Sequence, residues 1–151
     1  MDLSKKHNIH FAGNPQAGKT LVFGHGFGID QQSFSQIVPA FEQDYRIVLY
    51  DNAGGGKSDL SSYNYERYET LEGYVTDLTG IMAFTRGTHT TFIGHSVSGM
   101  MAANDIVVPP VVSEYMERHI PGSKRIKINA QGHFPQISAP DEVIAALQSF
   151  V

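Results

Sequence analysis

The strongest constraint on the fold is a repeated pairing of a short, β-rich apolar run with a polar or glycine-rich loop. These runs occupy residues 20–24 (TLVFG), 46–50 (RIVLY), 90–94 (TTFIG) and 125–129 (RIKIN), after a weaker run at 7–11. Stretches of helical character follow these runs at 31–42, 70–85, 111–119 and 140–150. Strands that alternate with helices predict a mostly parallel sheet with helices on both faces. Ligands of such sheets bind beyond the carboxyl ends of the strands, where the glycine loops fall.

Two of the helical stretches allow more specific predictions. The stretch 31–42 has apolar residues at helical spacing, but Pro39 is expected to break or kink it. The stretch 70–85 predicts one apolar stripe, formed by Leu71, Tyr74, Val75, Leu78 and Met82.

Length and composition fit one globular domain, which we predict to span residues 1–151. Hydrophobic residues make up 41% of the chain and charged residues 17%, which is typical of a folded protein and not of a disordered one. The net charge of −4 disfavours nucleic acid and anionic membranes as partners. The chain has no cysteine, which excludes disulfides, thiolate catalysis and cysteine-ligated zinc.

The sequence shows no targeting or membrane segment. The N-terminus has no long apolar run after its lysines, and no apolar stretch reaches the roughly 18 residues of a membrane span. We therefore expect a cytoplasmic protein that does not contact the membrane. No cofactor and no metal site are predicted.

Residues 13–20, GNPQAGKT, match the phosphate-binding loop pattern G-x-x-x-x-G-K-[ST]. That loop needs a following helix, whose N-terminal amides hold the phosphates. Here Thr20 is followed by LVFGHGFG, which combines strand residues with three glycines and disfavours a helix. DNAG at 51–54 resembles a second nucleotide-binding motif but fits any turn after a strand. We interpret 13–19 as a surface turn with an exposed Lys19, and NTP binding is the weakest hypothesis.

Residues 94–98, GHSVS, match the nucleophile-elbow pattern G-x-S-x-G, with Ser98 in place of the last glycine. An apolar run leads into this motif, as a strand-to-helix turn requires, and Ser98 is small. Ser96 is therefore the candidate nucleophile. An oxyanion hole at such an elbow uses the amide after the nucleophile, here that of Val97. The second donor comes from an early loop, and the N–H of Phe27 in HGFG is the candidate.

His133 is the candidate general base, because it follows the last strand-like run and the chain order nucleophile, acid, base fits. Asp105 is the candidate acid, with an ordinary cap or turn residue as the alternative. We expect His25 to form hydrogen bonds within its own loop and His95 to act in packing. The remaining histidines are expected on the surface: His7, His10, His89 and His119.

The chain resembles the α/β-hydrolases that include the bacterial stress regulator RsbQ and the plant strigolactone and karrikin receptors. The resemblance rests on HGFGIDQQSF, RIVLYDNAGGGKSDL, YERYETLEGY, GHSVSGM, EYMERHIPGS and GHFPQISAPDEV, in family order from about residue 7 to 150. It implies an α/β-hydrolase fold and slow hydrolysis of small esters or lactones in an apolar pocket. It also implies that a signalling protein is a partner.

The same resemblance implies roles for individual residues. The triad would be Ser96, Asp105 and His133, and the oxyanion donors would be Phe27 and Val97. The substrate pocket would include Gly26, His95 and Phe134.

The chain departs from this family between the nucleophile and the acid. Asp105 follows Ser96 by only nine positions, where the family has further strands and a helical lid. We therefore predict an internal deletion that joins two family halves near 101–104 and removes the lid. Such a deletion would expose the edge of strand 90–94 unless strand 125–129 lies beside it, and an exposed edge favours homodimer formation or aggregation. It also raises the alternative that the protein is an inactive ligand-binding or signalling remnant.

Overall fold

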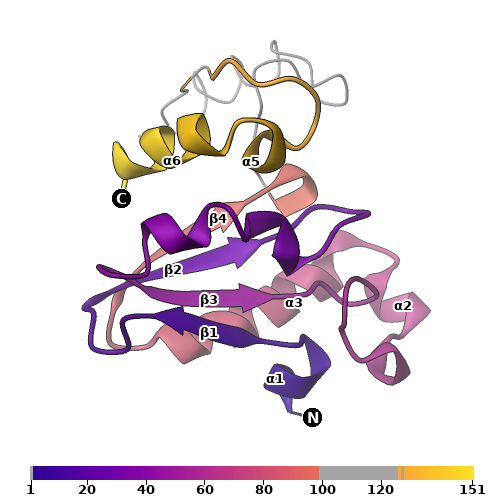
Figure 1. Cartoon of the computed structure of the whole chain (residues 1–151). Helices are drawn as coiled ribbons and strands as arrows, with labels where there is room; N and C mark the ends of the chain where they lie inside the picture. Colours follow the sequence, from indigo (N-terminus) through magenta and orange to yellow (C-terminus); the bar gives the residue numbers. More distant parts are fainter. Residues whose placement is uncertain (1, 99–125, 127) are drawn as a thin grey trace, which may run out of the picture.

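The structure is a computed structural model that describes residues 2–98, 126 and 128–151 (Figure 1). Several predictions concern residues outside these ranges: the helix at 111–119, the acid Asp105, the junction near 101–104 and the loss of the lid.

A four-stranded sheet forms the centre of the described part. Its strands are β1 (His10–Gly13), β2 (Lys19–Gly24), β3 (Arg46–Tyr50) and β4 (His89–Gly94), in the order β1-β3-β2-β4. β2 pairs in parallel with both β3 and β4, and β1 joins the outer side of β3 in the antiparallel sense. Gly24 lies beside Tyr50 on one side and Gly94 on the other, so the three parallel strands end at one edge.

The helices of the described residues are α1 (Leu3–Lys6), α2 (Tyr65–Tyr68), α3 (Leu71–Met82), α5 (Pro135–Ser138) and α6 (Pro140–Gln148). Short 3-10 turns occupy η1 (Gln31–Phe34), η2 (Val38–Ala40), η3 (Leu60–Ser62), η4 (Ala83–Thr85) and η5 (Ser96–Ser98). In Figure 1, α3 lies behind the sheet, and the segment with η1 and η2 crosses its front.

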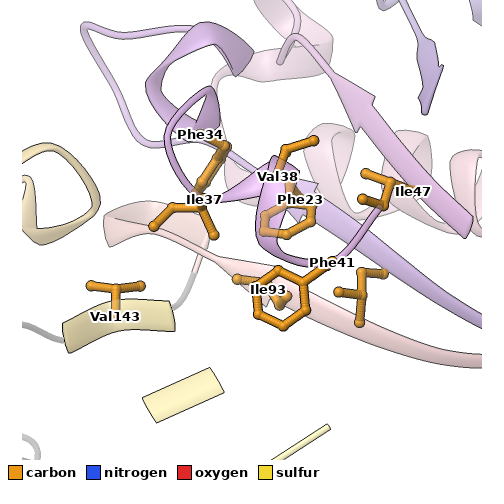
Figure 2. Close-up of a cluster of buried hydrophobic side chains, with 9 residues drawn as sticks. Phe23, Phe34, Ile37, Val38, Phe41, Ile47, Ile93 and Val143 are labelled. Carbon is orange, nitrogen blue, oxygen red and sulfur yellow. The ribbon is translucent and has the colours of Figure 1, made fainter. Parts of the chain in front are cut away.

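Each face of the sheet has its own apolar core. One core gathers Phe23, Ile47 and Ile93 from the strands with residues of η1, η2 and α6, including Phe34, Val38 and Val143 (Figure 2). The other packs Val22, Val48 and Tyr50 against Ile81 of α3. The prediction of a mostly parallel sheet with helices on both faces is therefore confirmed. The sequence of β2 is a nearly continuous apolar run because the side chains on both faces of this strand are buried.

The prediction of a helix at 31–42 is wrong, because the structure has two 3-10 turns there. Pro39 is the second residue of η2; it lacks an N–H, and its ring would clash with the carbonyl four residues earlier in an α-helix. The apolar residues at this spacing are nevertheless buried: Phe34, Ile37, Val38 and Phe41. The spacing of the apolar residues therefore predicted which side chains are buried, although the backbone there is not α-helical.

The prediction of a strand at 125–129 is also wrong for its described residues, since 126, 128 and 129 are irregular. The N–H of Asn129 donates to Glu142 Oε2 of α6 at 2.6 Å, so a helix carboxylate takes the donor that a strand would use for pairing. Within the described residues, β4 pairs only with β2.

The residues that resemble a phosphate-binding loop form a turn, as predicted. Lys19 begins β2, so a strand and not a helix follows the motif. The Lys19 ammonium lies 5.5 Å from the centre of the Tyr45 ring.

His7 is buried, which corrects its predicted place on the surface. Its Nδ1 donates to the carbonyl of Asp51 at 3.0 Å, and its Nε2 lies 3.2 Å from Asp77 Oδ2. The same Asp77 carboxylate pairs with Lys6 at 2.8 Å and Arg67 at 2.7 Å. These contacts fix the chain around α1 to α3.

Candidate active site

The turn after β4 has the geometry of a tight elbow. Ser96 has a φ of 54°, in the left-handed region that residues with a side chain rarely adopt. Ser98 N donates to the carbonyl of His95 at 2.9 Å, which folds the chain back on itself. A Cβ atom at Gly94 would lie 1.5 Å from the carbonyl oxygen of Ser98, so only glycine fits at the end of the strand.

Ser96 and His133 lie in hydrogen-bonding contact although they are 37 positions apart. The distance between Ser96 Oγ and His133 Nε2 is 2.6 Å. His133 lies in the loop before α5, next to Gly132, whose φ is 79°. The structure therefore brings together two residues that the sequence predicted as nucleophile and base.

His95 holds the loop of His133 in place. Its Nε2 donates to the carbonyl of His133 at 2.5 Å. The rings of His95, His133 and Phe134 pack on one another, with centroid distances of 4.9–5.4 Å. His95 is buried, which agrees with the expected packing role.

The loop after β2 approaches the elbow closely at Gly26. A Cβ atom at Gly26 would lie 2.8 Å from Ser96 Cβ and 2.7 Å from His95 Nδ1. The N–H of Phe27 donates no hydrogen bond within the described residues, and the Phe27 side chain is 66% exposed. Val97, the other predicted oxyanion donor, lies in η5 between Ser96 and Ser98. The predicted acid, Asp105, lies outside the described residues.

Two hollows adjoin this edge of the sheet. The larger is an open depression of about 780 Å³ between the loops after β2 and β3, lined among others by Gly26, Phe27 and Tyr63. The smaller has a volume of about 140 Å³ and is mainly apolar; its lining includes Phe27, Tyr50, Leu78, Phe92 and Ser98. Of the predicted pocket residues, Gly26 lines the larger hollow, whereas His95 and Phe134 line neither of the two.

Tyr50 is a residue near the site that the sequence analysis did not single out. It ends β3 and lines the smaller hollow. Burial raises the pKa of Tyr50 to about 12, so its hydroxyl stays protonated near neutral pH. Its position at the end of a predicted strand, next to a glycine loop, was the signal available in the sequence.

Asp51 organises the loops around the site without touching the elbow. Its carboxylate accepts hydrogen bonds from Gln31 N at 3.0 Å, Asn8 Nδ2 at 2.8 Å and Lys57 N at 2.9 Å. Burial alone would raise the pKa of Asp51, but these hydrogen bonds outweigh it and lower the pKa below its usual value. DNAG at 51–54 therefore acts as a turn after a strand.

The described residues contain no group of three or more His, Asp or Glu side chains that could hold a metal ion. In the same part of the chain, no helix is long and apolar enough to cross a membrane.

Comparison with known proteins gives sequence relatives among plant receptors and esterases. The chain is 45% identical over 82 residues to the karrikin insensitive 2 receptor IA of Petunia hybrida, covering 54% of this chain and 30% of that protein. It is 39% identical over 82 residues to the strigolactone esterase RMS3 of Pisum sativum, covering 54% and 31%. The chain thus spans about a third of the length of these relatives.

Solved structures match almost the whole chain. A hydrolase from Oleispira antarctica superimposes with a TM-score of 0.89 at 19% identity, covering 99% of this chain and 96% of that one. A predicted CIB-like hydrolase from Thermoplasma acidophilum gives a TM-score of 0.80 at 14% identity, with coverage of 94% and 90%. At these identities the match concerns the fold alone.

The family model described as the alpha/beta hydrolase fold matches residues 19–104, which include β2, β3, β4 and the elbow. That range is more than half of the chain. The chain therefore belongs to the α/β-hydrolase fold family.

Proposed function

We propose that the protein is an RsbQ-like serine hydrolase that cleaves small esters or lactones through an acyl-enzyme. The observation that carries the proposal is the 2.6 Å contact between Ser96 Oγ and His133 Nε2 at an elbow where Ser96 has a positive φ. A serine hydroxyl becomes a useful nucleophile when a neighbouring imidazole accepts its proton.

In the proposed reaction, Ser96 Oγ attacks the substrate carbonyl while His133 Nε2 takes the hydroxyl proton. The N–H groups of Phe27 and Val97 donate to the oxyanion that develops. His133 then returns the proton to the leaving alkoxide, and the acyl group stays on Ser96. Water attacks this ester in the second half, with His133 again as base. The bond between the acyl carbon and Ser96 Oγ then breaks, His133 returns the proton to Oγ, and the carboxylic acid leaves. Asp105 is the proposed acid that orients the imidazole of His133.

The hollows support a small substrate. The smaller one, at about 140 Å³, is close to the size of an engineered protein cavity of about 150 Å³ that holds benzene. It therefore fits a single ring or a short acyl chain. Phe27 lines both hollows, so a carbonyl near its N–H could extend one group into each.

The alternative is an inactive ligand-binding or signalling remnant. The observation that favours it is the spacing between Ser96 and Asp105, which is only nine positions where the family has further strands and a lid. Under either function, a signalling protein is a proposed partner and the cytoplasm the proposed location. Pairing of two copies along the outer edge of β4 is the proposed route to a homodimer.

Hydrolysis of p-nitrophenyl esters separates the two functions. We expect turnover of the acetate by the parent and its loss by at least 100-fold in Ser96→Ala, because the acyl-enzyme can no longer form. We also expect kcat/KM to fall for acyl chains longer than the smaller hollow admits. Ser62→Ala is the control, because it removes a hydroxyl that donates to Asp59 O at 2.7 Å in another loop. Equal turnover by Ser96→Ala and the parent would contradict the hydrolase.

A further inference from the structure

His25 joins the three loops that follow β2, β3 and β4. Its carbonyl oxygen accepts hydrogen bonds from Asn52 Nδ2 at 2.8 Å and from Ser98 Oγ at 2.9 Å. Asn52 follows β3, and Ser98 closes the elbow after β4. His25 is 2% exposed, and both bonds are partly buried, so they are stronger than they would be in water.

The contacts of the His25 ring fix its protonation state. Nε2 accepts a hydrogen bond from the N–H of Asn52 at 2.9 Å, so it carries no proton. Nδ1 must then hold the proton, and it donates to the carbonyl of Gly26 at 2.8 Å. Asp51 Oδ1 lies 3.8 Å from Nε2, but an unprotonated nitrogen cannot form an ion pair with it.

The bond from His25 to Gly26 has a consequence for Phe27. The carbonyl of Gly26 and the N–H of Phe27 belong to one planar peptide group, and the described residues contain no cis peptide bond. In a trans peptide these two groups point in opposite directions. Holding the Gly26 oxygen therefore sets the direction of the Phe27 N–H, the proposed oxyanion donor. This peptide lies beside the nucleophile, because a Cβ atom at Gly26 would lie 2.8 Å from Ser96 Cβ.

We propose that Asn52 and Ser98 are positioning residues that orient the Phe27 N–H through His25. This role rests on the proposed function of the same site. It also gives a reason for the departure from the elbow pattern: Ser98 supplies a hydroxyl that the usual glycine lacks. Restoring the pattern with Ser98→Gly would therefore weaken the site.

The kinetic test compares Ser98→Gly, Ser98→Ala, Ser98→Thr and Asn52→Ala with the parent on p-nitrophenyl acetate. Removal of an entire oxyanion donor slows an enzyme by about 100–1000-fold. For misorientation of one donor we expect kcat to fall about 10-fold in the Gly, Ala and Asn52 variants. KM and the pH at which the base titrates should not change, because His133 is untouched. Ser98→Thr keeps the hydroxyl and should retain activity, and Ser62→Ala should behave as the parent.

Two kinetic results would overturn the proposal. One is full activity of Ser98→Gly and Asn52→Ala. The other is a loss of activity that matches a loss of thermal stability in every Ser98 variant, including Ser98→Thr, since that pattern indicates only a structural role.

A second measurement does not depend on turnover. Long-range ¹⁵N–¹H correlation spectra report which ring nitrogen of a histidine carries the proton. We expect His25 of the parent in the neutral Nδ1–H form. Asn52→Ala and Ser98→Ala keep the backbone N–H that bonds to Nε2 and should keep this form, but the amide proton of Phe27 should shift in both because its peptide is held less firmly. A protonated or Nε2–H His25 in the parent would overturn the network even if the protein hydrolyses esters. Turnover that survives Ser96→Ala would instead contradict the proposed function. The hydrogen-bond network around His25 would then still be tested by the spectra.

Discussion

At the scale of single residues, the most demanding position is Gly94. The chain reverses so sharply after β4 that the carbonyl of Ser98 occupies the space of a side chain at position 94. The sequence pattern G-x-S-x-G predicted this need for a small residue, as it predicted the approach of Ser96 to His133. It could not predict the hydrogen bond from Ser98 to His25, because the pattern has glycine there and says nothing of a hydroxyl.

We expect Gly94→Ala to lower the free energy of unfolding by at least about 1–3 kcal/mol, because overpacking against a rigid backbone contact has a cost of this size. Urea denaturation measures the change. Gly18→Ala is the control, because a Cβ atom there meets nothing within 4 Å and the glycine has no positive φ. Equal stability of the two variants would contradict the tight elbow.

At the scale of elements, strands were predicted better than helices and loops. The bounds of β3 agree with the prediction, and those of β2 and β4 differ by one residue. The stripe predicted on α3 is only partly right: Leu71 and Val75 are exposed by 56% and 60%, and the helix buries Gly73, Asp77 and Ile81. Apolar periodicity missed Asp77, because a buried charge depends on partners elsewhere in the chain.

The Asp77 carboxylate connects α1, α2 and α3. It is 4% exposed and accepts from Lys6 Nζ, Arg67 Nη2 and Tyr68 Oη at 2.5–2.9 Å. We expect Asp77→Ala to lower the free energy of unfolding by about 3–5 kcal/mol, because Lys6 would stay buried without its partner. Thermal or urea unfolding measures the effect. Asp44→Ala, at an exposed position, is the control, and a loss as small as that of the control would contradict the role of Asp77.

The same cluster makes stability depend on pH. Burial lowers the pKa of His7 below its ordinary value of 6.5, although its bond to Asp51 opposes the shift. The folded state therefore binds this proton less readily than the unfolded chain does. Stability from His7 is complete above about pH 6.5 and is lost as the pH falls below it. Asp77 also has a lowered pKa: burial opposes the shift but its hydrogen bonds prevail, so its contribution is lost at lower pH still.

We expect the urea midpoint of the parent to decrease between pH 6.5 and 5. His7→Asn keeps a donor for the carbonyl of Asp51 but does not titrate, so its midpoint should change less over this interval. His10→Asn, at an exposed position, is the control and should follow the parent. A midpoint that rises on acidification would contradict the assigned direction.

At the scale of the whole molecule, the fold class was predictable because alternating strands and helices leave few ways to bury both faces of a sheet. The meeting of Ser96 and His133 was predictable from the elbow pattern and the chain order of nucleophile and base, although the strand expected before His133 is irregular in its described residues. The irregular path of the chain at Asn129 was not predictable, because its N–H is taken by Glu142 of α6. Such exchanges between a helix and a loop leave no periodic signal.

The proposed function requires Ser96, His133 and the oxyanion donors to act together in this chain. The most direct measurement is the intact mass of the purified protein after a fluorophosphonate probe, with Ser96→Ala and His133→Ala treated in parallel. We expect one adduct on the parent, none on Ser96→Ala and much slower labelling of His133→Ala. A folded parent that stays unlabelled, or a Ser96→Ala variant that is labelled as fast as the parent, would contradict it.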